Sequence, residues 1–442
     1  MNNLTNQLHN NGNKMIMQTG EQIRNFGILS CVITFLCCFD SVKAQNNDDI
    51  FPIWERGYFD IHHIETGGGN STFMIFPDGT TMLIDAGGLN FKHDPLKASP
   101  PLPSDSLTPG RWIVHYIKQV FPQNQVSQID LALITHFHGD HYGVVTQKVP
   151  LSESGKYRLT GITEVAEWIP IRKLIDRNYP DYNYPIDLVN KKSVDSTFMN
   201  YRAFIDWQKE LGEMSIESLV VGSNRQIVLQ KYPTDYPDFQ VRNIKSGGEV
   251  WSGQENKTVK CIPDSARKYY DKLFGENQLS IALKFSYGSF DYYHGGDNTG
   301  LQDSNHPWLD VETPIVKAVG AVDVATLDHH GNRDSCNDFW VKTLRSQVYV
   351  QQSWCSDQPG QEVFYRLSAE RKDQPKADIF ATYIHEETKV TYGRWFTNAY
   401  RSMEGHVVIR VMPSGKEFYV YVLDARSVYL KVKKKFGPYF SR

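Results

Sequence analysis

The chain has 442 residues, of which 40% are hydrophobic and 22% are charged, so it has the composition of a globular protein with ample material for a large core. Its formal net charge of −3 argues against a nucleic-acid binder that works by bulk electrostatic attraction. One basic run, Lys431 to Lys435, lies near the C-terminus and predicts a solvated tail over residues 426–442.

The N-terminus has the pattern of a secretory signal peptide over residues 1–44. Arg24 precedes the apolar stretch Phe26 to Phe39, which is too short to span a bilayer comfortably, and small residues then lead to Ala44. We therefore expect cleavage near Ala44 and a secreted or periplasmic protein without a transmembrane segment in the mature chain. Residues 45–57 are expected to form a short N-terminal extension, and an uncleaved anchor is the alternative.

Short strands separated by glycine and aspartate turns dominate the rest of the chain, over residues 58–425. The predicted strands are Phe59–Ile64, Ser71–Phe76, Thr81–Ile84, Ile129–Thr135, Leu279–Phe285, Ser289–Tyr293, Val322–Leu327, Ser346–Gln351, Gly405–Met412 and Glu417–Leu423. Helical patterns cover Arg111–Phe121 and Thr197–Gly212. Residues 150–275 are less regular and predict an elaboration that walls the active site. The two halves predict an α+β fold, an αββα sandwich of two mixed sheets with helices outside.

The strongest chemical motif follows the apolar strand that ends at Thr135. His136 and His138 lie two residues apart in extended chain and therefore project to the same side, where they can hold one ion. Gly139 allows a sharp turn, after which Asp140 and His141 can hold a second ion. Imidazole and carboxylate ligands favour zinc, with manganese or iron as alternatives.

Two later segments supply further ligands after predicted strands. Asp297, at the end of the sequence His294-Gly295-Gly296-Asp297, is placed where a carboxylate can bridge two ions. The pair His329-His330 can provide the last imidazole, and the sequence leaves open which of the two does so. The cysteines beyond residue 44 form no pair with zinc-type spacing, so a metal would depend on histidines and carboxylates; they are Cys261, Cys336 and Cys355.

The sequence here resembles the metallo-β-lactamase superfamily, because residues 136–141 match its HxHxDH motif. The rest is similar to the branch that contains the hydrolase domain of the competence protein ComEC and the phosphorylcholine esterases. The similar pieces are Gly67-Gly68-Gly69-Asn70, Leu83 to Gly88, Asn277 to Ser280, Gly295-Gly296-Asp297 and His329-His330-Gly331, in the same order over residues 58–425. The resemblance implies a dinuclear zinc site bridged by Asp297. It also implies that Asp85 orients a ligand histidine.

One departure from the superfamily pattern is that no histidine occurs from Tyr142 to Tyr293. The first ion would then be held by His136, His138, Asp297 and a hydroxide. The second would be held by Asp140, His141, Asp297 and His330. A single ion, or a substitute ligand such as Asp176, stays open.

These observations predict an exported zinc-dependent hydrolase that uses a metal-activated hydroxide, with Asp140 and His329 as catalytic residues. His329 is the candidate that protonates the leaving group. A small-molecule or cell-surface phosphodiester or phosphoester is the expected substrate. The alternatives are a nuclease, a lactone or lactam hydrolase, and a non-catalytic binding protein on the same fold.

Overall fold

The structure is a computed structural model that describes residues 49–89, 98–123, 127–192, 195–371 and 376–442. The predicted signal peptide, residues 1–44, lies outside the described residues. Within the described ranges, no helix combines the length and the apolar character needed to cross a membrane.

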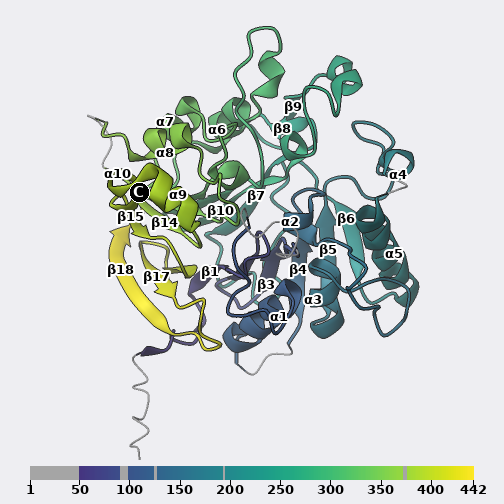
Figure 1. Ribbon diagram of the computed structural model, residues 1–442, viewed down its shortest axis with the longest axis horizontal. Coiled ribbons are helices and arrows are strands. Elements are labelled where there is room, and N and C mark those ends of the chain that lie inside the picture. Colours follow the sequence, from purple (N-terminus) through teal and green to yellow (C-terminus); the bar gives the residue numbers. More distant parts are fainter. Residues whose placement is uncertain (1–48, 90–97, 124–126, 193–194, 372–375) are drawn as a thin grey trace, which may run out of the picture. The chain divides into compact units, whose positions relative to one another are not determined.

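Two nine-stranded mixed sheets form the centre of the fold (Figure 1). In the first sheet, neighbours from β18 to β3 pair antiparallel, and neighbours from β3 to β6 pair parallel. Its spatial order is β18 (Val432–Phe440), β17 (Glu417–Leu423), β16 (His406–Val411), β1 (Phe59–His63), β2 (Thr72–Ile75), β3 (Thr81–Ile84), β4 (Ile129–Leu133), β5 (Ile171–Asp176) and β6 (Ser215–Ser218).

The second sheet is parallel from β15 to β11 and antiparallel from β11 to β9. Its spatial order is β15 (Tyr400–Ser402), β14 (Asp378–Ala381), β13 (Val348–Gln351), β12 (Val324–Thr326), β11 (Phe290–His294), β10 (Ala282–Tyr287), β7 (Phe239–Ser246), β8 (Glu249–Trp251) and β9 (Thr258–Lys260).

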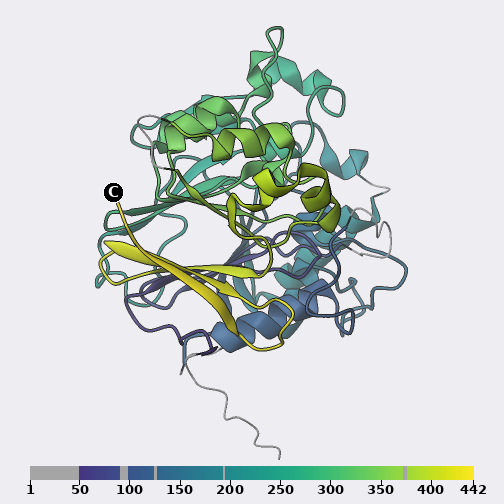
Figure 2. The same ribbon diagram turned by 60° about the vertical axis from the view of Figure 1, so that its left-hand side comes forward.

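Helices cover the outer faces of both sheets, and Figure 2 shows the resulting layers, with α1 on one side and α6, α7 and α8 on the other. The α-helices are α1 (Pro109–Val120), α2 (Gly139–Tyr142), α3 (Ile162–Trp168), α4 (Leu188–Lys191), α5 (Ser196–Leu211), α6 (Glu312–Val319), α7 (Asp338–Leu344), α8 (Gln361–Ser368), α9 (Glu386–Tyr392) and α10 (Arg394–Thr397). Short 3₁₀ helices are η3 (Asp264–Tyr269), η4 (Asn277–Leu279), η5 (Pro307–Leu309) and η6 (Asp328–Gly331).

The core has an inner part between the sheets and an outer part under the helices. On β4, Leu131 and Leu133 belong to the inner cluster, whereas Ala132 belongs to the outer one. On β13, Val348 faces inward and Tyr349 packs outward, where it stacks on Trp340 of α7. Because both faces of these strands are buried, their sequences are almost continuously apolar, which made them recognisable.

The prediction of an αββα sandwich is confirmed, and the two predicted helices correspond to α1 and α5. The start of α1 shows why the sequence was informative. Thr108 caps the helix by accepting a hydrogen bond from the backbone N–H of Arg111, and Pro109 occupies the first helical turn, where no intrahelical donor is needed.

Two predicted segments are corrected by the structure. Residues 426–442 are not a solvated tail, because residues 432–440 form β18 and pair with β17. β18 is an edge strand that pairs with β17 alone and is largely exposed, so its lysines stay in contact with solvent although their backbone is part of the sheet. Residues 150–275 are more than an elaboration, because β5 and β6 extend the first sheet and β7 to β9 extend the second.

Candidate metal centre

The predicted ligands lie at the carboxyl ends of three strands that belong to the two facing sheets. His136 to His141 follow β4 and run into the short helix α2, Asp297 follows β11, and His330 lies in η6 after β12. Ligand sites in sheets of parallel strands commonly form at this edge, because the loops there converge. The structure thus brings together side chains that are up to 194 residues apart, from His136 to His330.

Four side chains form what we call the second metal group: Asp140, His141, Asp297 and His330. His330 Nε2 lies 3.1 Å from Asp140 Oδ2 and 3.3 Å from Asp297 Oδ2. His141 Nε2 lies 3.1 Å from Asp297 Oδ1 and 3.7 Å from Asp140 Oδ2. A tetrahedral zinc ion with bonds of about 2.0–2.1 Å separates its ligand atoms by about 3.4 Å, so these spacings fit such an ion.

Three side chains form the first metal group: His136, His138 and Asp297. His136 Nε2 lies 3.1 Å from His138 Nδ1 and 3.6 Å from Asp297 Oδ2. These separations also fit tetrahedral coordination, and Asp297 belongs to both groups. The geometry is therefore that of two adjacent cation sites with one shared carboxylate.

Two buried atoms of this cluster make no hydrogen bond, namely His141 Nε2 and Asp297 Oδ1. They lie 3.1 Å apart, close enough to share one bound ion. Buried polar atoms are normally satisfied, so each unsatisfied one needs an explanation. A cation held between them satisfies both, and the residues present therefore fit a bound divalent metal.

The electrostatics of the cluster favour positive charge. Burial alone lowers the pKa of His330, but Asp297 and Asp140 raise it to about 10. Burial also opposes ionisation of Asp297, yet His141 and His330 hold the pKa of its carboxyl well below the usual range. Burial keeps the pKa of His136 well below its ordinary value, so that its imidazole is neutral and ready to bind a metal.

In both histidines of the second metal group, the ring nitrogen that points away from the group is held by a protein acceptor. His141 Nδ1 lies 2.7 Å from Asp85 Oδ2, and Asp85 in turn accepts hydrogen bonds from the backbone N–H and the hydroxyl of Thr135. His330 Nδ1 donates to the carbonyl oxygen of Gln352 at 2.9 Å. The role that the resemblance implies for Asp85 thus has a geometric basis, because these contacts fix which nitrogen faces the metal group.

Three residues at the site have left-handed backbone. Asp85, His329 and His330 have φ values of 59°, 44° and 57°, although none of them is glycine. Such conformations cost about 1–3 kcal/mol each and persist where surrounding contacts impose them. Because of this backbone, the adjacent rings of His329 and His330 point to different partners. His330 joins the metal group, and His329 turns to Asp334.

Glycines allow the neighbouring loops to pack directly on α2. A side chain at Gly69 or Gly87 would meet the carbonyl oxygen of Asp140. The same carbonyl accepts the backbone N–H of Asn70 at 2.7 Å, and Ala86 N donates to His141 O at 2.7 Å. The glycine turns noted in the sequence therefore position the backbone that carries Asp140 and His141.

Asp176 does not replace the missing histidine, which corrects that alternative. Its Oδ1 accepts hydrogen bonds from the backbone of Asn178 and Tyr179, and its Oδ2 accepts the hydroxyls of Tyr182 and Tyr201. All its acceptor capacity is directed away from the metal groups, and it belongs to neither of them. Its role at the end of β5 is to hold the following loop.

The residue after Asp176 supports the metal-binding turn in a way that sequence reasoning missed. Arg177 forms a buried bidentate ion pair with Glu276, with N–O distances of 2.6 and 2.8 Å. Glu276 Oε1 also accepts the backbone N–H of Phe137, the residue between the two histidines of the first metal group. Nothing in the local sequence around Glu276 indicates this contact, because its partners lie 99 and 139 residues away.

His329 lies at the edge of the cluster rather than within a metal group. Its Nδ1 is 2.6 Å from Asp334 Oδ1, and its Nε2 is 2.9 Å from Asn277 Nδ2 and 4.0 Å from Asp297 Oδ2. The ring is therefore oriented by Asp334, while its second nitrogen lies between Asn277 and the shared carboxylate of Asp297. This arrangement suits a group that exchanges a proton with a substrate.

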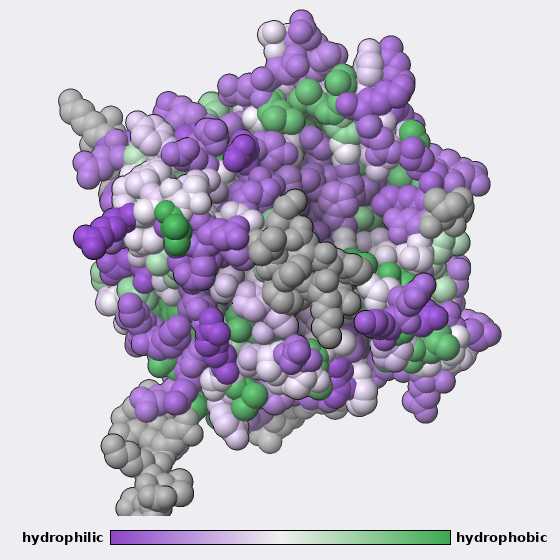
Figure 3. Space-filling view, in the orientation of Figure 1, coloured by the Kyte–Doolittle hydropathy of each residue, from purple (hydrophilic) through white to green (hydrophobic). Residues whose placement is uncertain are grey.

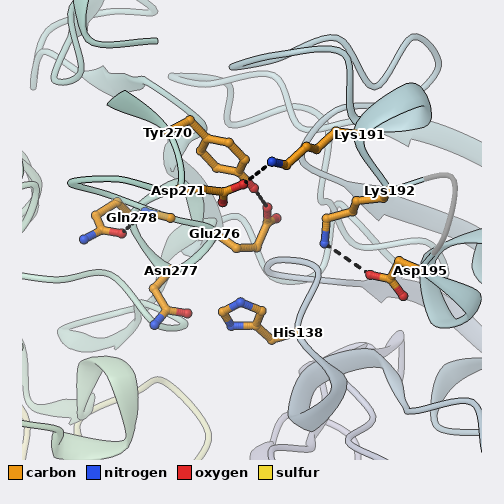
Figure 4. A pocket seen from close by; sticks show the side chains of 10 residues that line it. His138, Lys191, Lys192, Asp195, Tyr270, Asp271, Glu276, Asn277 and Gln278 are labelled. Carbon is orange, nitrogen blue, oxygen red and sulfur yellow. Dashed lines mark hydrogen bonds and ion pairs between the residues drawn. The ribbon is translucent and has the colours of Figure 1, made fainter. Parts of the chain in front are cut away.

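A cavity of about 340 Å³ opens beside the first metal group (Figure 4). His138 and Asn277 lie at one end of the view, and Lys191 and Lys192 lie at the other, with Glu276 between them. The face shown in Figure 3 is mainly hydrophilic and hollowed beside its centre. The cavity gives a substrate direct access to His138, which is only partly buried.

Trp354 is a further support that sequence reasoning missed. It follows β13, and its indole Nε1–H donates to Asp140 Oδ2 at 2.9 Å, the same oxygen that faces His330 Nε2. Its position just beyond a strand end is a weak signal that could have drawn attention to it. The hydrogen bond fixes the rotamer of Asp140 and leaves one lone pair of Oδ2 for a cation.

Replacing Trp354 with phenylalanine is expected to weaken metal binding at the second metal group by about 10- to 100-fold, because the ring volume is largely kept while the donor is lost. A zinc titration against a competing chelator measures this change. Binding at the first metal group should keep its affinity, and Trp395→Phe, on the surface of α10, is the matched control. Unchanged affinity at both groups would exclude this role for Trp354.

Comparisons with known proteins agree with this architecture only at a low level of similarity. No protein-family model matches the chain, and no curated protein matches it. Similar solved structures include a putative metal-dependent hydrolase from Parabacteroides distasonis, with 13% identity, a TM-score of 0.32, and coverage of 73% of this chain and 92% of that chain. Another is the hydrolase AbOPH of the beta lactamase superfamily, with 13% identity, a TM-score of 0.27, and coverage of 52% and 55%.

Human tRNase Z, short form, is similar with 13% identity, a TM-score of 0.28, and coverage of 66% of this chain and 91% of that chain. Similarity at this level transfers no activity, substrate or metal to the present chain. The class that fold and site define is an αββα sandwich with a buried histidine–aspartate cluster at the strand ends.

Proposed function

We propose that this chain is a metal-dependent hydrolase of the metallo-β-lactamase superfamily that cleaves a phosphodiester or phosphoester. One observation carries the proposal: two groups of ligand atoms, each with spacings suited to a divalent cation, share the carboxylate of Asp297. Histidines and carboxylates without a thiolate support zinc as the metal, with manganese or iron as alternatives. The pattern of residues 1–44 supports an exported protein.

The residues of the cluster have distinct tasks in this reaction. A bound divalent metal lowers the pKa of water toward neutrality and polarises a phosphoryl oxygen of the substrate. Asp140 and Asp297 contribute the negative charge that retains the cations, and His136, His138, His141 and His330 supply neutral imidazole ligands. Asp85 and the carbonyl of Gln352 keep His141 and His330 in the required orientation.

His329 is the proposed proton donor to the leaving oxygen. Asp334 holds its Nδ1, so the proton that is transferred is the one on Nε2, which lies beside Asn277 and 4.0 Å from Asp297 Oδ2. Asn277 can donate to Nε2 or accept from it according to the orientation of its amide, and it therefore accommodates both protonation states. In this proposal His329 protonates the leaving oxygen, while the other residues of the cluster hold the metal that activates the attacking water.

The intact cluster speaks against a non-catalytic binding protein, because such a protein has no use for six converging ligands and a separately oriented histidine. The absence of a histidine between residues 142 and 293 supports a phosphoester over a lactam or lactone, since the resemblance implies that histidine in many other members of the superfamily. The net charge of −3 speaks against a nuclease.

Removal of the metal tests this proposal directly. Protein treated with a chelator and dialysed is expected to lose hydrolysis of p-nitrophenyl phosphodiesters, and addition of zinc is expected to restore it. Metal analysis of the active protein should give about two ions per chain. The same preparation is tested on a lactam, a lactone and single-stranded DNA. Full turnover by metal-free protein, or hydrolysis of the lactam alone, would refute the proposed function.

A further inference from the structure

The cavity beside His138 has two ammonium groups at the end that lies away from the metal groups (Figure 4). Both come from the segment at the end of α4, where Lys191 is the last helical residue and Lys192 follows it. The contacts that hold the metal ligands do not explain why two lysines lie at this end of the cavity. Their partners show how firmly each ammonium group is held.

Lys192 is well placed but weakly paired. Its side chain is only 17% exposed, and its Nζ lies 3.7 Å from Asp195 Oδ2, beyond the range of a direct hydrogen bond. Asp195 uses its other oxygen to cap α5, accepting the backbone N–H groups of Thr197 and Phe198. Lys192 can therefore turn to another anion without leaving Asp195 unsatisfied.

Lys191 is paired at the surface. Its Nζ lies 3.0 Å from Asp271 Oδ2, and both side chains are about half exposed. Exposed pairs of this kind contribute about 0–1 kcal/mol, so exchanging the partner costs little. Both lysines at this end of the cavity are thus available to a ligand.

The acidic group in the middle of the cavity does not oppose an anion. Glu276 is neutralised by the bidentate contact with Arg177, and it also accepts the hydroxyl of Tyr270 and the backbone N–H of Phe137. Arg177 holds the pKa of the Glu276 carboxyl below its usual range, although burial alone would raise it. Its charge is therefore balanced within the protein, and the other charged side chains that line the cavity are the two lysines and their exchangeable partners, Asp195 and Asp271.

We propose that this cavity binds an anionic substituent of the substrate, a second phosphate or a carboxylate, that extends from the reacting phosphoester at His138 toward Lys192 and Lys191. The inference rests on the proposed function, because it assumes that the ester is cleaved at the metal groups. It adds a substrate class: phosphodiesters with a further negative charge on the ester group that stays on phosphorus after cleavage.

A pair of matched substrates tests the inference. One is a p-nitrophenyl phosphodiester whose second ester group carries a carboxylate, and the other is the same phosphodiester with that carboxylate converted to its methyl ester, so that the second charge is absent. Wild-type protein is expected to show a lower KM for the carboxylate. Lys192→Met, which keeps the apolar stem, is expected to raise that KM by about tenfold or more, because charge-assisted hydrogen bonds are lost. The kcat for the carboxylate substrate and the kinetics of the methyl-ester substrate should stay the same.

Two further variants sharpen the result. Lys192→Arg should restore most of the preference, and Lys342→Met, a lysine paired with Asp338 on α7, is the matched control. Binding of the corresponding inert phosphonates, measured by calorimetry, should show the same preference without turnover. If wild-type protein cleaves both esters with the same KM, the inference fails and the proposed function stands. If metal-loaded protein cleaves neither ester, the proposed function fails as well.

Discussion

Asp297→Ala is expected to abolish hydrolysis and to remove both metal ions, because Asp297 contributes to each metal group. The loss of cation chemistry worth several kcal/mol corresponds to a fall in kcat/KM of about a thousandfold or more. His138→Ala removes a ligand of the first metal group alone. That variant is expected to retain about one ion per chain while also losing activity. Metal content by elemental analysis and kcat/KM on a p-nitrophenyl phosphodiester measure the two effects.

The difference in metal content between Asp297→Ala and His138→Ala distinguishes a ligand shared by both metal groups from a ligand of one group. Asp303→Ala, which removes an exposed carboxylate outside the cluster, is the control for loss of an aspartate. Circular dichroism of each variant is the check that it is folded. Retention of two ions by Asp297→Ala would contradict a shared ligand, and loss of both ions in His138→Ala would contradict two separable groups.

His329→Gln is expected to lower kcat by about 10²- to 10⁴-fold on a substrate with a poor leaving group, because the donor of the proton is lost. On a substrate that releases p-nitrophenolate the loss should be much smaller, since that leaving group needs no proton. The ratio of kcat values for alkyl and p-nitrophenyl esters is the measurement. Metal content should be unchanged, because His329 Nε2 lies 4.0 Å from Asp297 and outside both groups.

Asp334→Asn provides the companion variant for this prediction. It keeps a hydrogen-bonding group opposite His329 Nδ1 but removes the charge. We expect a smaller loss than in His329→Gln with the same dependence on the leaving group. Equal losses on both kinds of ester would show that His329 supports the structure of the site and does not transfer a proton.

Much of this site could be read from the sequence because its parts are local. Four side chains lie within residues 136–141, immediately after a strand that is buried on both faces. Asp297 and the pair His329-His330 each follow a recognisable apolar strand. Since strand ends of facing sheets converge, their gathering followed from the fold class. The backbone decided what the sequence left open, since left-handed conformations direct His330, rather than His329, into the metal group.

The residues that hold the metal ligands and His329 in place could not be predicted from the sequence in the same way. Trp354, Glu276 and Asp334 have no periodicity or spacing that marks them, and each acts through a partner that is distant in sequence or lies across a tight turn. Strand β5 was also missed, because the exposed Arg172 and the partly buried Lys173 interrupt its apolar pattern near the start of the strand. Such features depend on tertiary contacts, which override local propensity.

The basic end strand has a consequence for how the protein behaves in solution. Residues 433–435 are three exposed lysines on β18, the last strand of the first sheet, and Pro438 on the same strand cannot donate a backbone hydrogen bond. An unpaired sheet border is a template on which another chain could align and start aggregation. Because like charges repel and Pro438 lacks a donor, another chain cannot easily pair with this border, and the run of lysines thus disfavours self-association of the sheet.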